Sequence, residues 1–434
     1  MKKLGTWMES LTDWMTDEFA PRANKVTGNL WVKALQEAIM AVVPMILVGS
    51  LITLVSILNN FFSWMPNLTP INQFSFGLMG LFVAFLIPYH VMQHKDFRDR
   101  RLVAGMAGVA VFLMLIGPTF SEDGGSITFT FERFGATGMF TSILAGLAVA
   151  AVFNLFAKLK MFKNSTALPD FIIVWFDSML PILLSLLVTW LLVDVAHLDI
   201  YAGLLAIFSP LTAIVQSFWG FVILYFIGAF LYSFGMSAWI LFPIVYPLQL
   251  QGIQDNMAAV AAGHPATNIN TYEVLYSGWV GIGGIGATLP LVIMMAFWAR
   301  SARLKAIGRA SLAPSIFNIN EPIVFGAPIA FNPILMVPFW INSIVPPVLT
   351  YWALSSGLVP IPSQLFQMWY TPFPFATWIV SPGLASMVLL AVITALVTLT
   401  WLPFFRAYDR QAVAEDEAEE AEELNAADTA GAAA

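Results

Sequence analysis

The 434-residue sequence contains no cysteine. The chain therefore cannot form a disulfide, bind a metal through a thiolate or use a cysteine nucleophile. Any thiol chemistry in its function must belong to a partner protein. Charged residues are also scarce, at 10% of the chain, whereas about a quarter of the residues in a soluble domain are charged. This composition excludes an ordinary water-soluble domain.

Hydrophobic residues are abundant instead, at 59% of the chain, and they include 36 Phe, 20 Met and 15 Trp. Several apolar runs exceed the roughly 18 to 20 residues that span a bilayer core. We therefore predict an all-α integral membrane protein with about ten transmembrane helices. The predicted spans are 31–58, 74–92, 102–116, 138–156, 171–193, 201–217, 218–246, 279–298, 329–354 and 377–402.

The basic residues indicate how these spans are oriented, because Lys and Arg concentrate in cytoplasmic loops. They gather before the first span and after the second, fourth and eighth spans: Lys2, Lys3, Arg22, Lys25, Lys33, Lys95, Arg98, Arg100, Arg101, Lys158, Lys160, Lys163, Arg300, Arg303, Lys305 and Arg309. This distribution predicts that both termini lie in the cytoplasm. The segment 201–217 must then cross the membrane, because otherwise the basic loop around Lys305 would lie outside.

The two ends of the chain differ from its apolar body. Residues 1–26 begin like a signal peptide but lack its uninterrupted apolar core, so this segment should remain attached. Apolar residues recur there at spacings of three and four, which predicts an amphipathic helix at the membrane interface. Packing against another cytoplasmic element is the alternative. Residues 413–434 are rich in Ala and Glu and lack aromatic anchors, which predicts a disordered acidic tail.

The segment 315–338 combines polar residues with prolines at apparent membrane depth. It reads SIFNINEPIVFGAPIAFNPILMVP. Proline removes a backbone donor and restricts the residue before it, so we predict a broken backbone here. Irregular backbone at this depth is tolerated only where it is buried in protein or lines a wet cavity. The segment is therefore a candidate binding site.

Glu321, within this segment, is the only acidic residue between Glu273 and Asp409. An ionisable residue in so long an apolar stretch indicates function. With Asn318 and Asn320 beside it, the Glu321 carboxylate offers closely spaced acceptors and donors. This chemistry suits sugar hydroxyls better than an apolar or strongly cationic substrate. The alternative is a structural role, in which Glu321 caps a helix or pairs with the basic loop.

Four other patterns carry weaker signals. Gly281–Gly286 spells G-x-G-x-x-G without the preceding strand that a dinucleotide site needs, so its glycines allow close helix packing or close approach of a sugar. His90 and His94 stand four apart, but without a third ligand of suitable spacing we predict no metal site. Asp177 is either a polar contact between helices or part of the transport pathway. Trp369 belongs to an aromatic cluster that forms either an interfacial belt or a wall of the sugar cavity.

Several motifs follow one another along the chain: AVVPMILVGSL at 41–51, WVGIGGIGATLPL at 279–291, FNINEPIVFG at 317–326, NPILMVPF at 332–339 and PFFRAYDRQ at 403–411. Together they resemble the IIC subunits of bacterial phosphotransferase systems of the lactose/cellobiose (diacetylchitobiose) class. The likeness runs from the first predicted span to the last. It implies a sugar permease with re-entrant hairpins in its C-terminal half.

The resemblance also implies which residues bind the substrate. The Glu of the family's NEP motif contacts the sugar near the hydroxyl to be phosphorylated, which implies this role for Glu321. The family usually carries a His in the sixth or seventh span, where SFGMSAWI places Ser237, and Ser cannot titrate near neutral pH. His264 is a candidate substitute. The predicted substrate-binding residues are Glu321, Asn318, Asn320, Ser237, His264, Gly283, Gly284, Thr288 and Trp369. No catalytic residue, metal or cofactor is predicted.

The mechanism implied by the resemblance is group translocation of a sugar, expected to be a β-linked disaccharide or related oligosaccharide. A separate IIB partner would phosphorylate the sugar from a phosphocysteine, with IIA, HPr and enzyme I acting before it. The chain would then be the membrane subunit of a phosphoenolpyruvate-dependent sugar phosphotransferase, and its lack of cysteine is consistent with a separate donor chain. An ion-coupled secondary sugar transporter is the alternative, because it too has broken helices near the middle of the membrane.

The resemblance further implies two transmembrane domains. Residues 27–200 would form a homodimer, and residues 201–412 would bind the substrate. The expected location is the lipid bilayer of the bacterial plasma membrane, and no nucleic-acid partner is expected.

Overall fold

The computed structural model describes residues 29–57, 64, 66–158, 170–236, 241–326 and 329–432. Within these residues, regular structure is helical except for a short antiparallel hairpin of β1 (Thr119–Phe120) and β2 (Ile127–Thr128). The predicted all-α fold is therefore confirmed. The predicted interfacial helix at 1–26 and Ser237 lie outside the described residues.

The chain divides into two compact units. The N-terminal unit holds the described part of Arg22–Ile214 together with Ile240–Gln254, and the C-terminal unit holds that of Val215–Trp239 and Asp255–Ala434. The predicted boundary between 200 and 201 therefore differs from the one in the structure. The reason is that α9 (Ile200–Gln216) packs on the N-terminal helices, where its Phe208 ring stacks on Phe140 at 4.1 Å.

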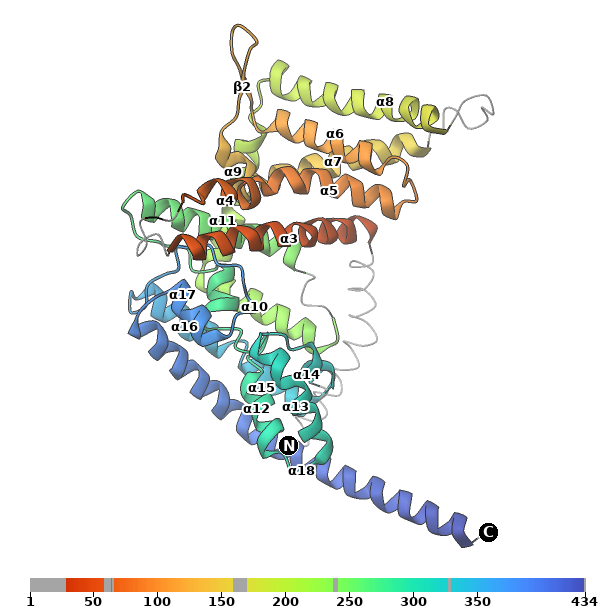
Figure 1. The fold of residues 1–434 in the computed structure, drawn as a ribbon, viewed down its shortest axis with the longest axis vertical. Helices are drawn as coiled ribbons and strands as arrows, with labels where there is room; N and C mark the ends of the chain where they lie inside the picture. Colours follow the sequence, from red (N-terminus) through yellow and green to blue (C-terminus); the bar gives the residue numbers. More distant parts are fainter. Residues whose placement is uncertain are drawn as a thin grey trace. The chain divides into compact units, whose positions relative to one another are not determined.

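The long helices of the N-terminal unit lie side by side (Figure 1). They are α3 (Leu30–Ile57), α5 (Met79–His94), α6 (Arg101–Leu115), α7 (Met139–Lys158) and α8 (Asp170–Trp190). Besides β1, β2, most of α9 and the first part of α11 (Phe242–Ala261), this unit contains α4 (Thr69–Ser75), η3 (Phe76–Leu78), η4 (Phe131–Phe134), η5 (Ala136–Gly138) and η6 (Leu191–Val195). Gly108 allows α5 and α6 to approach closely, because a Cβ atom there would lie 2.2 Å from the carbonyl oxygen of Ala84.

The C-terminal unit is built mostly from short or interrupted helices and ends in the long helix α18. They are α10 (Phe218–Ser233), the last part of α11 (Phe242–Ala261), the π-helical η8 (Glu273–Gly278), α12 (Leu289–Trp298), α13 (Ala302–Ile316), α14 (Glu321–Gly326), α15 (Pro333–Ile341), α16 (Val345–Ser355), α17 (Phe373–Val380) and α18 (Leu384–Ala432). Its core contains the fully buried Trp279 and Trp401. Their indole nitrogens donate to the carbonyl oxygens of Ser386 (2.9 Å) and Ala287 (3.0 Å), so both polar groups are satisfied.

Six helical segments among the described residues are long and apolar enough to cross a membrane, and the broken pair of α9 and α10 gives a seventh candidate. The six are Leu30–Gly49, Thr69–His94, Ala136–Ala157, Trp175–Val195, Pro333–Ser355 and Leu384–Ala418. The helices α6 and α12 are apolar but shorter. The chain is a multi-span membrane protein, as predicted, while the count of ten spans stays a prediction.

Several predicted spans are not single continuous helices in the structure: the segment 329–354 is divided between α15 and α16, and the segment 377–402 between α17 and α18. Two more are interrupted as well. The segment 218–246 contains both α10 and the start of α11, and the segment 279–298 becomes α-helical only at Leu289. In the first case Gly235 follows the end of α10 with a φ of 74°, a left-handed conformation that does not continue a helix. Hydropathy does not detect such a break, because the residues around it remain apolar.

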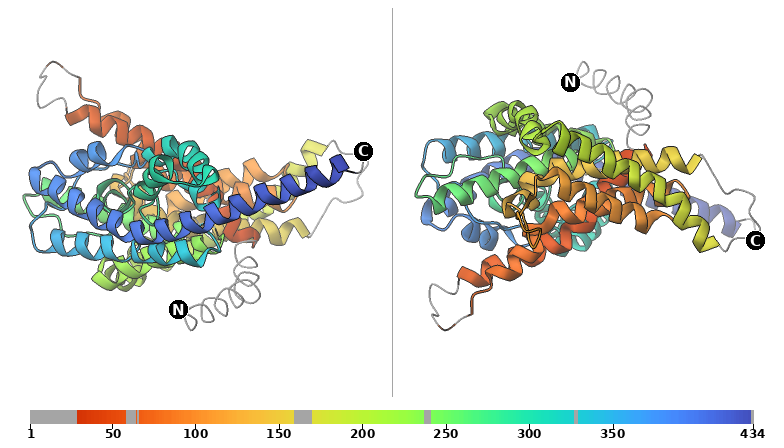
Figure 2. Two further views of the ribbon diagram at one scale, coloured as in Figure 1. Left: turned by 90° about the horizontal axis from the view of Figure 1, so that it is seen from below. Right: turned by 90° about the horizontal axis from the view of Figure 1, so that it is seen from above.

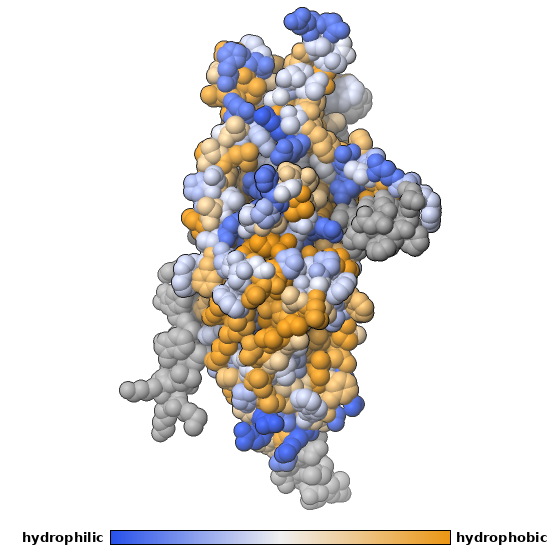
Figure 3. Space-filling model, turned by 90° about the vertical axis from the view of Figure 1, so that its left-hand side faces the viewer, coloured by the Kyte–Doolittle hydropathy of each residue, from blue (hydrophilic) through white to orange (hydrophobic). Residues whose placement is uncertain are grey.

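Exposed apolar side chains cover an outer face of the C-terminal unit, where Figure 3 shows a broad hydrophobic surface bounded by polar residues at one end. On α18 the exposed apolar residues recur every three or four positions: Leu384, Val388, Val392, Leu396 and Leu399. A surface of this kind is unfavourable in water and is typical of a helix that faces lipid.

The helix α18 continues through the acidic region as one long helix (Figure 2). This differs from the disordered tail predicted from position 413. Ala and Glu are strong helix formers, so a helix that has already formed extends into them without a new nucleus. The start of the acidic region is also bonded to the start of α13. The Ser301 hydroxyl donates to Asp416 (2.6 Å), and the Arg303 guanidinium donates to Glu415 (2.7 Å).

We expect a cysteine introduced at Lys305, on α13, to escape a membrane-impermeant thiol reagent added outside intact cells. The predicted orientation places Lys305 in the cytoplasm and the β1–β2 hairpin outside. The native chain has no cysteine, so any label must come from the introduced residue. Glu122→Cys, at an exposed position of the hairpin, is the matched control and should react. Labelling of Lys305→Cys in intact cells would contradict the predicted topology.

Candidate functional site

Three segments of the C-terminal unit meet at the side chain of Asn318: residues 279–288, 317–320 and 366–371. The Asn318 Oδ1 atom accepts a hydrogen bond from the backbone nitrogen of Gly283 (3.0 Å). Its Nδ2 atom donates to the carbonyl oxygens of Trp369 (2.6 Å) and Thr371 (3.0 Å). The buried amide of Asn318 therefore joins the glycine-rich segment, the turn before α14 and the segment before α17. We call this meeting point the Asn318 junction.

The neighbouring Asn320 reinforces this junction. Its Nδ2 atom donates to the carbonyl oxygen of Ile285 (2.8 Å). A Cβ atom on Gly284, which has a φ of 102°, would lie 2.4 Å from the Asn320 Cγ atom. Only glycine permits this approach. The buried Thr288 donates from Oγ1 to the carbonyl oxygen of Gly283 (2.7 Å).

The structure thus brings six of the predicted substrate-binding residues together: Asn318, Asn320, Gly283, Gly284, Thr288 and Trp369. The polar side chains among them bond to the protein backbone, so the structure gives them a positioning role. Their predicted contact with a sugar stays a prediction.

The broken backbone predicted for 315–338 is present, as α13, α14 and α15. The helix α13 ends at Ile316, and Asn318 then adopts a φ of 62°, a left-handed conformation that Asn tolerates better than most residues. The carbonyl oxygen of Asn320 accepts from the backbone nitrogens of Ile323 (3.1 Å) and Val324 (2.9 Å), which begins α14. This turn places Glu321 at the start of a new helix directly beside the Asn318 junction.

Glu321 is exposed, unlike the two asparagines before it. Within the described part of the chain its carboxylate makes no ion pair and no side-chain hydrogen bond. The pair with the basic loop is therefore not seen among these residues, whereas Glu321 does stand in the first turn of α14, where a carboxylate stabilises a helix. The basic loop has its own partner, since Arg303 pairs with Glu415. An unpaired carboxylate on a firmly held turn is available to a ligand.

The segment that carries Trp369 is anchored by Glu273, a fully buried residue of η8. Its Oε1 atom accepts from the backbone nitrogen of Phe366 (3.0 Å) and from Nε2 of Gln367 (2.6 Å). The rings of Trp369 and Tyr370, 5.9 Å apart, follow directly after this anchor. No role was predicted for Glu273, and its place at the border of the acid-poor stretch was the only signal in the sequence.

Two predicted site residues are not joined to this junction. His264 is exposed in the segment after α11, and no described residue bonds its side chain. Ser237 lies outside the described residues. Contact of either residue with a sugar stays a prediction.

The polar residues noted in the first half of the sequence have partners within the N-terminal unit. His94 Nε2 lies 2.7 Å from Glu37 Oε2, and His90 Nδ1 lies 3.3 Å from the same oxygen. Arg100 Nη2 lies 2.5 Å from Asp177 Oδ2, and both side chains are buried. Of the two interpretations of Asp177, the structure therefore supports a polar contact between helices.

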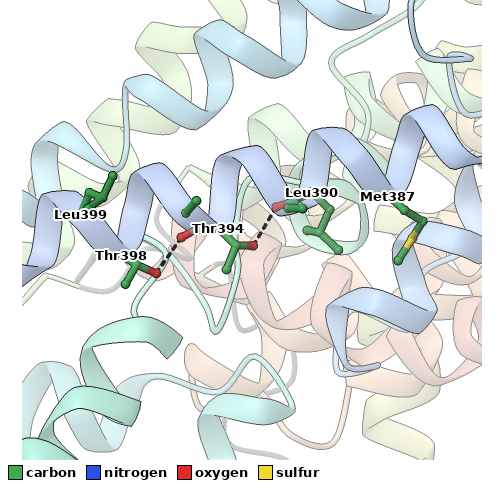
Figure 4. Close-up of a pocket in the computed structure, with 7 residues that line it drawn as sticks. Met387, Leu390, Thr394, Thr398 and Leu399 are labelled. Atoms are coloured by element: carbon green, nitrogen blue, oxygen red, sulfur yellow. Dashed lines mark hydrogen bonds between the residues drawn. The ribbon is translucent and has the colours of Figure 1, made fainter.

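A surface pocket runs along α18 (Figure 4). It is lined by Met387, Leu390, Ala391, Thr394, Ala395, Thr398 and Leu399. The hydroxyls of Thr394 and Thr398 donate to backbone carbonyls of their own helix, each at 2.7 Å. All lining residues come from one apolar face, so the pocket lacks the convergent polar groups that a sugar requires. The Asn318 junction remains the candidate site.

The family model described as "Phosphotransferase system, EIIC" matches residues 36–343, which is more than half of the chain. The matched region includes Glu321, Asn318 and the glycine-rich segment 279–288, whereas residues 366–371 lie beyond it. The chain belongs to the phosphotransferase system EIIC family. The predicted function as a sugar permease of this system is thereby confirmed, and the ion-coupled alternative receives no support.

Individual relatives agree with this assignment along nearly the whole chain. The cellobiose-specific EIIC component of Geobacillus stearothermophilus is 27% identical over 442 residues, covering 95% of this chain and 97% of the relative. The lactose-specific EIICB component of Staphylococcus epidermidis is 26% identical over 439 residues, covering 96% of this chain and 72% of the relative. The crystal structure of ChbC, the IIC component of the N,N'-diacetylchitobiose-specific system, matches with a TM-score of 0.84 and 26% identity, covering 93% of this chain and 99% of ChbC. The predicted class within the family is confirmed.

Proposed function

We propose that this EIIC chain binds a β-linked disaccharide or related oligosaccharide and holds it for phosphorylation while moving it across the membrane. The observation that carries the proposal is the exposed, unpaired carboxylate of Glu321 on the turn that Asn318 and Asn320 fasten. Such a carboxylate accepts hydrogen bonds from sugar hydroxyls at a fixed position. The relatives named for cellobiose, lactose and diacetylchitobiose support the substrate class, because these sugars share a β linkage.

The phosphoryl group comes, in this proposal, from the phosphocysteine of a separate IIB chain. This EIIC chain contains no cysteine, so it cannot carry that donor. The name of the lactose-specific relative, EIICB, supports a partnership of the two components. IIA, HPr and enzyme I act before IIB. The contribution of the EIIC chain is positioning, since placing a hydroxyl in line with the donor is most of what phosphoryl transfer requires of a scaffold.

The proposed location is the bacterial plasma membrane, with both termini in the cytoplasm. The clusters of Lys and Arg support this orientation, in which α13, the helix that leads directly to Glu321, would lie on the side where IIB acts. We further propose that the N-terminal unit forms a homodimer and that the C-terminal unit binds the sugar.

Uptake by membrane vesicles that contain this chain is expected to require phosphoenolpyruvate together with enzyme I, HPr, IIA and IIB. The product inside should be sugar phosphate, because transport and phosphorylation are coupled. The measurement is accumulation of radiolabelled cellobiose and diacetylchitobiose, with the product separated from free sugar. Vesicles that lack IIB are the control and should accumulate no sugar phosphate. Uptake of unmodified sugar driven by an ion gradient would contradict the proposal.

A further inference from the structure

The C-terminal end of α10 carries a buried tyrosine whose hydroxyl is unsatisfied. Tyr232 is 5% exposed, and its hydroxyl has no hydrogen-bond partner among the described residues. Burying a hydroxyl without a partner is unfavourable, and nearly all buried polar groups in folded proteins have one. Several other buried polar atoms among the described residues also have no partner, so the surroundings of Tyr232 decide whether a ligand can supply one.

The position of Tyr232 is fixed by the residue next to it. The carbonyl oxygen of Ser233 accepts from the backbone nitrogen of Phe331 (3.0 Å), and the Ser233 hydroxyl oxygen accepts from Nε1 of Trp340 (2.9 Å). The Tyr232 ring also packs near Phe339, with ring centroids 6.4 Å apart. The end of α10 is therefore tied to α15 and to the residues just before it.

Tyr232 lies on the side of α14 that carries Glu321. Its ring meets the Phe325 ring edge-on, with centroids 5.6 Å apart and an interplanar angle of 87°. Phe325 follows Glu321 by four residues on α14, and residues at this spacing share a helix face. The unsatisfied hydroxyl and the unpaired carboxylate thus border the same region.

We propose that Tyr232 donates a hydrogen bond to the sugar that Glu321 binds. A sugar hydroxyl can both donate and accept a hydrogen bond. It can therefore donate one to the Glu321 carboxylate while it accepts one from the Tyr232 phenol, which stays protonated at neutral pH. The pair would fix a hydroxyl from two sides. This inference rests on the proposed role of Glu321.

Tyr232→Phe removes only the hydroxyl and is expected to weaken binding of cellobiose or diacetylchitobiose about two- to tenfold, the range for one neutral hydrogen bond. The unfolding temperature of the sugar-free protein should stay unchanged or rise, because the lost hydroxyl had no partner there. The stabilisation caused by added sugar should shrink. Calorimetry and thermal unfolding of purified protein measure these effects.

Tyr351→Phe is the matched control in the same unit. The Tyr351 hydroxyl donates to the carbonyl oxygen of Gln216 (3.4 Å), so its loss affects a contact within the protein and should leave sugar affinity unchanged. Wild-type affinity in Tyr232→Phe, with Glu321→Gln impaired in parallel, would overturn the role of Tyr232 alone. A lower unfolding temperature without a change in affinity would do the same. If the wild-type chain binds neither sugar, the proposed function itself fails.

Discussion

Replacing Asp177 with alanine is expected to lower the free energy of unfolding by about 3–5 kcal/mol, because it leaves the charge of Arg100 buried without a partner. The two side chains are 7% and 9% exposed and meet at 2.5 Å. Arg100 stands at the start of α6 and Asp177 lies within α8, so the pair joins two of the long helices of the N-terminal unit. The unfolding midpoint of the purified protein in detergent, by heat or denaturant, measures the effect.

Two further variants separate this effect from a general loss of charge. The double variant Arg100→Met with Asp177→Leu removes both charges and should be close to the wild type in stability, because an apolar pair needs no compensation. Glu415→Ala breaks a pair with Arg303 in which both side chains are 45% exposed, and it should change stability by no more than about 1 kcal/mol. If Asp177→Ala is no worse than Glu415→Ala, the buried pair does not stabilise the protein.

Hydropathy predicted the class of fold, because a chain with this composition can satisfy its backbone in a membrane only as helices or a barrel. It did not predict where helices are interrupted. The break after α10 depends on the backbone conformation at Gly235, and the late start of α12 depends on the glycine-rich segment before Leu289. Apolar residues surround both places. The helical tail shows a second limit of prediction from composition. The composition of the residues beyond 413 indicates only that they bury little surface, but a helix that has already formed can extend without burial.

Only those parts of the candidate site could be predicted in which one residue stands out in the sequence by itself. Glu321 stood out because it is isolated in an apolar stretch, and the prolines around it indicated a broken backbone. The role of Asn318 was less visible, since its three hydrogen bonds reach segments distant in the sequence. Tyr232 could not be found in this way. A tyrosine in an apolar helix is unremarkable until the structure shows that its hydroxyl has no partner among the described residues.

Replacing Glu321 with glutamine is expected to weaken sugar binding about ten- to a hundredfold, because a hydrogen bond to a charged group contributes about 1.5–3 kcal/mol. Glutamine keeps the shape of the side chain and removes only the charge. The rate of phosphorylation by IIB should fall at least as much, since a hydroxyl that is no longer oriented reaches the donor less often. Calorimetry with cellobiose or diacetylchitobiose measures the affinity, and formation of sugar phosphate with a IIB partner measures the rate.

The same substitution should leave the unfolding midpoint of the sugar-free protein unchanged. Glu321 is exposed and has no ion pair within the described residues, so the fold loses no contact there when the charge is removed. Glu122→Gln, on the exposed hairpin of the N-terminal unit, removes one negative charge far along the chain from the site and serves as the control. A loss of binding that appears in Glu321→Gln but not in Glu122→Gln identifies a local effect. Unchanged affinity and unchanged phosphorylation in Glu321→Gln would instead assign Glu321 a structural role, because a carboxylate that orients the reacting hydroxyl cannot be neutralised without changing at least one of the two.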